Sequence, residues 1–344
     1  MDRQIREQEE NAPPRSFAAA IEELLLVPAY ASRWAPASIA AHRGLAFPLQ
    51  LLGQMHRWTV QLGDGTVHVA GVGRQKLIEP LCHRLFGELA RPSHEARRAL
   101  WNPAALVKTD ADLVVAEVHR WMAPRFRRSG WLIVPEAVRW QGALTEVPPA
   151  TPSRSLFEDL RKVRQHGFTV TQTTAPQDWE LFYHEMVRPQ AMARHGESAW
   201  LPSRRLMAEF ARAGTLHMIS RGGVRVAGAC SLGSGDNLWL PLSGIRHGDP
   251  ALLRQGAGTA ALALTLEWAR LQGYRRVDAG RTGPFLNDGL QRFKRKWGLL
   301  PTPDPLAHVA AVWVATSAAR KIFSQQPVLV EQGTDLRTYA GEAA

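Results

Sequence analysis

Along the N-terminal half of the chain, apolar positions switch between the two-residue period of strands and the longer period of helices. Residues 58–62 and 66–70 are predicted strands joined through Gly63-Asp64-Gly65, a strong hairpin signal. The elements expected after this hairpin are a helix at 77–90, a buried strand at 112–117, a helical stretch around Met122 and a strand at 130–134. This alternation predicts an α/β unit.

The second half of the chain has a different order of elements. Ser153 or Ser155 can cap a helix that Gly167 ends. The elements expected next are a helix at 178–192, an antiparallel meander of strands at 215–220, 224–232 and 238–242, a long Ala/Leu-rich helix at 252–271 and a strand at 275–279. A helix that connects strands in this way gives a right-handed crossover to a parallel neighbour.

A proline-rich stretch separates the two halves. Residues 146–153 contain three prolines, which favour an exposed, extended connector. The length of 344 residues is about twice that of a usual domain, so two domains are expected. The predicted division is a flexible arm at 1–15, an N-terminal domain at 16–145, the connector at 146–153, a C-terminal domain at 154–320 and a C-terminal tail at 321–344.

Composition and charge limit the function classes. The content of 45% hydrophobic and 21% charged residues excludes global disorder, and no apolar run approaches the roughly 18 residues that cross a bilayer. The net charge of +11 favours a polyanionic partner: a nucleotide cofactor, RNA or an anionic membrane surface. Cys82 and Cys230 lack metal-ligand spacing, so no metal is expected. The charged residues 1–10 do not resemble a secretory signal, and a cytoplasmic location is expected.

A glycine-rich turn before the long helix is the most informative segment. Gln255, Gly258 and Ala260 fit the pattern Gln/Arg-x-x-Gly-x-Gly/Ala, in which backbone N–H groups at a helix start hold a pyrophosphate. An ordinary loop-to-helix junction explains the glycines equally well. The predicted donor-binding residues are Gln255, Gly256, Ala257, Gly258, Thr259 and Ala260, with Leu242 and Ser243 on the preceding strand.

The order of meander, glycine turn, long helix and parallel strand resembles the fold of the Gcn5-related N-acetyltransferases (GNAT). Within the meander, Pro241 cannot donate to a strand ladder, so its strand should end, bulge or splay there. In the family, separation of the two central strands makes room for the pantetheine arm of the donor. An edge strand is the alternative interpretation of Pro241.

A second segment narrows the resemblance. Asp278, Gly280-Arg281, Phe293-Lys294 and Trp297-Gly298 occur in the order found in the Fem-type and cellulose-synthesis-type branch of this superfamily. The similarity covers residues 153–301. It implies an α/β (α+β) chain with tandem GNAT-like domains, each a mixed, mostly antiparallel sheet flanked by helices. The acceptor would lie between the domains and the donor on the second domain.

The N-terminal half fits this family pattern less well. Its turn at 71–75 has poor spacing, so no second nucleotide site is expected there. That half is therefore expected to be a degenerate GNAT-like domain that shapes the substrate site.

Direct acyl transfer needs a neutral amine, a stabilised oxyanion and a neutralised leaving group. The resemblance implies that Lys294 stabilises the oxyanion or the leaving group and that Arg281 positions an anionic group. Asp278 and His247 are the candidate general bases, although Asp278 can equally anchor a loop. The residues expected to face the substrate are Phe293, Trp297, His195 and Arg161.

Three functions remain open from the sequence. The leading one is an N-acyltransferase that moves an acyl group from acyl-CoA, for example acetyl-CoA, to an amine by direct attack. The second is an aminoacyl-tRNA-dependent transferase acting on a cell-wall or natural-product amine, favoured by the positive charge and by the basic helix with Arg161, Lys162 and Arg164. The third is a non-catalytic RNA- or surface-binding protein, which the basic and aromatic stretch 121–128 allows. In each catalytic case the acceptor is an amine on a small molecule, a glycan or a peptide.

Overall fold

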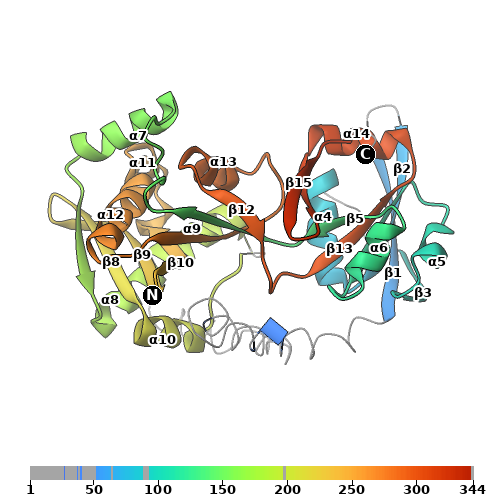
Figure 1. Cartoon of the computed structure of the whole chain (residues 1–344), viewed down its shortest axis with the longest axis horizontal. Coiled ribbons are helices and arrows are strands. Elements are labelled where there is room, and N and C mark those ends of the chain that lie inside the picture. Colours follow the sequence, from blue (N-terminus) through green and yellow to red (C-terminus); the bar gives the residue numbers. More distant parts are fainter. Residues whose placement is uncertain are drawn as a thin grey trace.

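The computed structural model describes residues 27, 37, 39–40, 52–62, 65–87, 93–196 and 199–341. Within these residues, two large sheets form two lobes that lie side by side along the long axis of the molecule (Figure 1). The arm predicted at 1–15 lies outside the described residues. In this described part, no helix combines the length and the hydropathy needed to cross a bilayer.

The N-terminal sheet contains one parallel pair among antiparallel neighbours. Its order is β3 (Ser93–Ala99), β1 (Leu52–Leu62), β2 (Gly65–Gly73), β4 (Leu113–Val118), β13 (Val309–Val314) and β5 (Leu132–Pro135). The β1–β2 hairpin pairs Leu62 with Gly65, as predicted. Helix α4 (Gln75–Phe86) connects the parallel strands β2 and β4.

Helices cover both faces of this sheet. On one face, Ile78 of α4 packs with Ile322 of α14 (Ser317–Gln325) and with Val328 of the hairpin β14 (Val328–Gln332) and β15 (Asp335–Tyr339). On the other face, Leu106 of α5 (Pro103–Val107) packs with Phe126 of α6 (Ala123–Arg128). The segment predicted as a tail at 321–344 is therefore largely part of the N-terminal core.

The C-terminal sheet repeats this plan. Its order is β12 (Leu300–Pro303), β6 (Val138–Ala143), β11 (Arg276–Thr282), β10 (Asn237–Ile245), β9 (Val224–Ser234), β8 (Thr215–Arg221) and β7 (Thr169–Thr173). β10 and β11 are the parallel pair, and the predicted helix lies between them in the chain. The predicted mixed, mostly antiparallel sheets flanked by helices are thus confirmed in both lobes.

Two helical layers enclose the C-terminal sheet. Helix α7 (Arg154–Gln165), which Ser153 caps as predicted, packs with α12 (Ala257–Leu271) on one face through Val163 and Ala260. The other face is covered by α8 (Pro176–Leu181), a π-helical segment (Phe182–Val187), α9 (Arg188–His195) and α10 (Arg204–Ala213). A further helix, α13 (Gly289–Lys296), follows β11 and packs beside it.

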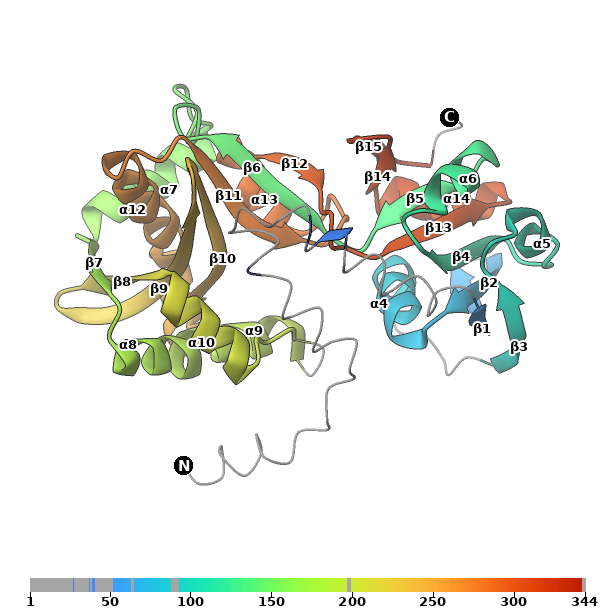
Figure 2. The same cartoon turned by 60° about the horizontal axis from the view of Figure 1, so that its bottom comes forward.

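The boundary between the lobes differs from the predicted one. Every strand of the C-terminal sheet lies between residues 138 and 303, so this domain is inserted between β5 and β13 of the N-terminal sheet. Figure 2 shows the β5–β6 and β12–β13 connections crossing between the lobes. The predicted connector at 146–153 therefore follows β6 within the C-terminal domain, because the period of a strand does not say which sheet it joins.

Candidate active site

The two parallel strands of the C-terminal sheet separate in the middle of the domain. β10 and β11 pair from Asn237 to Trp239 and no further, and the β9–β10 register shifts between Trp239 and Leu242. The predicted splay near Pro241 is therefore confirmed. On β11, Gly280 has φ +77, and a Cβ there would lie 2.9 Å from the Leu240 carbonyl oxygen. Only glycine fits this approach of the two strands.

A groove begins at the wedge-shaped gap between β10 and β11, where the two strands separate. A cavity of about 440 Å³ is lined by 240–243 of β10, 279–281 of β11, Gly258 of α12 and Lys294 of α13. It joins a cavity of about 920 Å³, which shares Gly258, Arg281 and Phe293 with the first. We call the two together the α12 groove. It connects the splayed strands with the N-terminus of α12, where N–H groups lack intrahelical partners.

The glycine turn at the start of α12 is shaped by two glycines with different roles. The predicted single helix at 252–271 is broken at Gly256, which has φ +96, so that α11 (Pro250–Arg254) ends before α12 begins. Gly258 has ordinary helical geometry, and a Cβ there would meet Ile245 at 3.6 Å and Leu253 at 3.8 Å. These are normal contacts, so the fold does not need glycine at 258. The missing side chain instead leaves space in the α12 groove.

The other predicted donor-binding residues fall into two groups: some have side chains buried in the core, and others have side chains that line the groove. Ala257, Thr259 and Ala260 are buried toward the core. Ala257 and Thr259 can offer a ligand their backbone N–H groups, whereas the Ala260 N–H donates to the Gly256 carbonyl at 2.8 Å. The Gln255 side chain accepts a hydrogen bond from Arg221 and is held by β8. Side chains that line the α12 groove include Leu242 and Ser243, both predicted.

Lys294 is a buried amine at the wall of the groove. Its side chain is 5% exposed, and Nζ donates to the carbonyl oxygens of Gly280 and Arg281, both at 3.1 Å. Burial lowers the pKa of Lys294 to about 7, although the Asp288 carboxylate favours the charged form. A neutral amine has two N–H bonds, which the two carbonyls can accept. Its lone pair then remains available for a proton.

Comparison with known proteins identifies the C-terminal domain. Residues 154–295 match the family model described as an acetyltransferase (GNAT) domain. We call the domain that contains this match the GNAT domain. The match confirms the predicted class of enzyme, an acyltransferase, but not its donor or acceptor. The α12 groove lies in the domain that carries the match. No curated protein matches the sequence significantly.

Several solved structures resemble the chain at low identity. The C-terminal domain of a putative lysylphosphatidylglycerol synthetase from Agrobacterium fabrum is 13% identical with a TM-score of 0.42, over 88% of this chain and 93% of that one. FemX is 11% identical with a TM-score of 0.40, over 74% and 83%. A tandem GNAT protein from the clavulanic acid biosynthesis pathway is 12% identical with a TM-score of 0.33, over 88% and 96%. Such low scores decide nothing about substrates.

Asp278 of the GNAT domain holds the splayed strand in shape and does not face the groove as a base. Its side chain is fully buried and forms an ion pair with Arg139. It also accepts hydrogen bonds from the Gly280 backbone N–H at 2.8 Å and from Gln141 at 3.0 Å. The candidate role as general base is therefore corrected to the role of a loop anchor.

Arg281 lies at the groove, as predicted, and it has an ion partner that sequence reasoning missed. Its Nε lies 2.5 Å from Oδ2 of Asp304, a fully buried carboxylate. Asp304 also accepts from the Leu306 backbone N–H at 2.9 Å. This arrangement fixes the guanidinium at the groove wall. No local motif marks Asp304, because its partner is 23 positions away in the sequence.

Other predicted substrate-facing residues are not brought to the groove. Phe293 lines it, but Trp297 is fully buried in the core of the GNAT domain. His247 is exposed in the turn 246–248 and is not among the residues that line the groove. Arg161 is on the exposed face of α7, paired with Glu158. These placements correct the roles predicted for Trp297, His247 and Arg161. The side chain of His195 lies outside the described part of the chain.

Two groove residues on α9 were also missed. Gln190 and Arg194 line both parts of the α12 groove. Gln190 accepts a hydrogen bond from the Ile245 backbone N–H at 2.6 Å and so ties α9 to β10. The segment around His195 was expected to face the substrate, but the helical period alone did not show which of its residues point to the groove.

The corresponding helix start in the N-terminal lobe is filled by the protein itself. The Glu117 carboxylate accepts from the Arg74 backbone N–H at 2.9 Å and from its Nε at 2.8 Å, directly before α4. A Cβ at Gly73 would lie 2.5 Å from Glu117 Cβ. A carboxylate therefore stands where an anion would bind. This supports the expectation that the turn at 71–75 holds no nucleotide.

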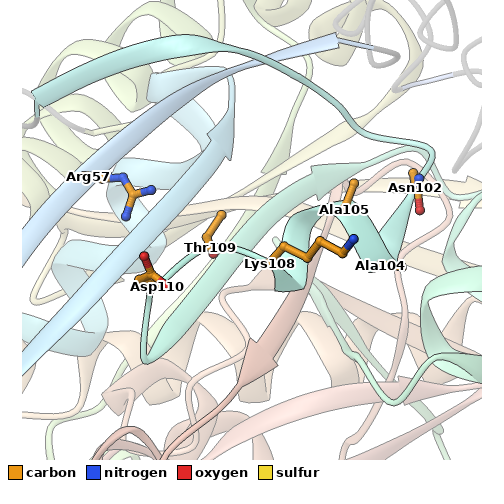
Figure 3. A pocket seen from close by; sticks show the side chains of 7 residues that line it. All are labelled: Arg57, Asn102, Ala104, Ala105, Lys108, Thr109 and Asp110. Atoms are coloured by element: carbon orange, nitrogen blue, oxygen red, sulfur yellow. The ribbon is translucent and has the colours of Figure 1, made fainter.

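A separate cavity of about 380 Å³ lies in the N-terminal lobe (Figure 3). Arg57 of β1 lies near residues of α5 and of the loop after it, including Lys108 and Asp110. Its lining mixes both charges and contains no glycine turn. It therefore lacks the features that distinguish the α12 groove.

Proposed function

We propose that the protein is an N-acyltransferase that uses acyl-CoA as donor and a neutral amine as acceptor. One observation carries the proposal: the α12 groove joins the open position at Gly258, the splayed strands and the buried amine of Lys294. The space at Gly258 can admit a diphosphate, and the gap between the splayed strands can admit an extended arm. Lys294 lies where the acyl group at the end of that arm would be.

The charges along the groove suit a polyanionic donor. The cations that line it are Arg194, Arg281, Arg292 and Lys296, of which Arg281 pairs with Asp304 and Lys296 with Asp159. Asp288 is the acidic residue among the lining residues, and it pairs with Arg84. The start of α12 adds backbone N–H groups and the positive end of the helix dipole. Coenzyme A carries its phosphates at one end and its thioester at the other. We therefore place the phosphates at α12 and the thioester near Lys294.

Lys294 has the properties of a proton carrier for this reaction. In its neutral form it accepts a proton from the attacking amine while the new C–N bond forms. The resulting ammonium lies beside the departing sulfur and returns the proton as the C–S bond breaks. We therefore propose that Lys294 both stabilises the leaving group, as the sequence predicted, and acts as a base. The second role is possible because burial brings the pKa of Lys294 close to neutrality.

An aminoacyl-tRNA donor is the second candidate. The observation that favours it is the exposed basic face of α7, which carries Arg154, Arg161 and Arg164 in the same domain as the groove. Filter binding separates the two donors. A tRNA affinity that falls several-fold with each doubling of salt, without any affinity for coenzyme A, would favour the aminoacyl-tRNA reaction.

The substitution Gly258→Asp tests the proposed donor site. The carboxylate would fill the open position and repel the diphosphate, so we expect calorimetric titration to show loss of acetyl-CoA binding. Leu271→Asp is the matched control, since it adds the same charge at the far end of α12, where Leu271 is 84% exposed. Equal acetyl-CoA affinity in both variants and the wild type would refute the site.

A further inference from the structure

A second, more apolar cavity lies between the two lobes. It has a volume of about 350 Å³ and is enclosed by α4, by the β5 and β13 strands and by residues 283–288 of the GNAT domain. Its apolar wall includes Ile78 and Leu81 from α4, Val134 and Val309 from the strands, and Phe285. We call it the α4 pocket. None of these side chains belongs to the α12 groove.

The α4 pocket is adjacent to the α12 groove. Gly283 and Asp288 line both, and Arg281 of the groove lies two residues before Gly283. The wall they form is fixed to the N-terminal lobe, because the Leu286 N–H donates to the Pro327 carbonyl and the Leu329 N–H to the Pro284 carbonyl, both at 2.9 Å. The α4 pocket and the α12 groove are therefore held next to each other, on either side of residues 283–288.

Charge distinguishes the pocket from the groove. Two of its carboxylates already have partners: Glu117 pairs with Arg74, and Asp288 lies 3.4 Å from Arg84. Glu136 is exposed at the pocket, and among the described residues no cation forms an ion pair with it. The cationic groove thus lies next to an apolar pocket with an unneutralised carboxylate at its edge.

We infer that the α4 pocket binds the acceptor and that this acceptor is an apolar primary amine of the aralkyl or alkyl class. The apolar walls exclude water from a hydrocarbon group, and Glu136 favours a cationic molecule over an anionic one. The bound ammonium ion must give one proton to water before the neutral amine attacks the thioester. Sugar nucleotides and acidic amino acids do not fit this combination. The reaction of the bound amine rests on the proposed function, but its binding does not.

Binding without donor tests the pocket directly. In calorimetric titrations, 2-phenylethylamine should bind about tenfold or more tightly than glucosamine, because only the former buries an apolar group. Leu81→Asn, which removes apolar surface without adding charge, should abolish this preference. Glu136→Lys, an exposed change that does not touch the core, should weaken 2-phenylethylamine binding by about fivefold. Glu146→Lys is the charge-matched control on an exposed residue outside the pocket, and thermal unfolding reports whether each variant is folded.

The outcomes separate the two proposals. Selective binding of 2-phenylethylamine without acylation in the presence of acetyl-CoA would contradict the proposed function and leave the pocket supported. Acylation of glucosamine as fast as of 2-phenylethylamine, or equal binding by wild type and folded Glu136→Lys and Leu81→Asn proteins, would overturn the pocket and leave the transferase standing.

Discussion

At the scale of single residues, Lys294 connects stability with function. A lysine this deeply buried favours its neutral form in the folded protein, with a pKa of about 7, whereas the unfolded chain holds its proton up to about 10.5. Between these values the unfolded state binds more protons, so the contribution of Lys294 to stability becomes more favourable as pH rises. At pH 7 the buried amine therefore lowers the free energy of unfolding. A residue kept at such a cost is a good candidate for chemistry.

Substitutions of Lys294 should separate its charge from its basicity. Lys294→Arg keeps a cation that does not deprotonate, so we expect kcat/KM to fall about 100-fold or more and the pH inflection near 7 to vanish. In the wild type, kcat/KM should rise with pH through about 7, because protonated Lys294 cannot accept a proton.

Lys294→Met tests the cost in stability of burying this amine. It should be inactive yet more stable than the wild type at pH 7, by about 1–4 kcal/mol in chemical denaturation. Full activity of Lys294→Arg with an unchanged pH profile would show that charge alone suffices and would rule out the basic role.

Sequence predicted the groove residues that depend on local spacing and missed those that depend on distant contacts. Gly258, Arg281, Phe293 and Lys294 belong to short patterns, and all four line the α12 groove. Asp304 meets Arg281 only through the fold. Trp297 belongs to the same pattern as Lys294 but is turned into the core, since α13 ends there and the chain reverses at Gly298 with φ +81.

At the scale of secondary structure, the meander, the crossover and the wedge followed from the sequence. Pro241 carried the signal for the separation of β10 from β11. The break between α11 and α12 did not follow, because the Ala/Leu-rich pattern at 252–271 continues through Gly256. The left-handed conformation of that glycine turns the chain so that α12 begins at the groove. The helix start is therefore set by one backbone conformation that hydrophobic periodicity does not encode.

At the scale of the whole molecule, the GNAT domain is an insertion within the N-terminal lobe. β6 lies between β11 and β12 in its sheet, although β6 precedes the proline-rich connector in the chain. Likewise β13 separates β4 from β5. Local patterns predicted two α/β units, but the pairing of strands that are far apart in sequence set their true limits.

Two fragments test this organisation. Residues 136–306 contain every strand of the GNAT sheet, so we expect this fragment to be soluble and to unfold cooperatively. Residues 154–320 lack β6, which leaves β11 and β12 without their shared neighbour, and this fragment should aggregate or remain unfolded. Circular dichroism and NMR dispersion provide the measurement. A well-folded 154–320 fragment would show that β6 is dispensable and would contradict the insertion.

Hydrogen exchange with and without acetyl-CoA reports whether the α12 groove holds the donor. Bound donor should slow amide exchange at residues 257–259, proposed to hold the phosphates, and at Leu240, Leu242 and Ser243, proposed to lie along the pantetheine arm. The Gly258→Asp protein should show no such change. Protection confined to other regions, or its absence at saturating acetyl-CoA, would show that the α12 groove does not bind the donor.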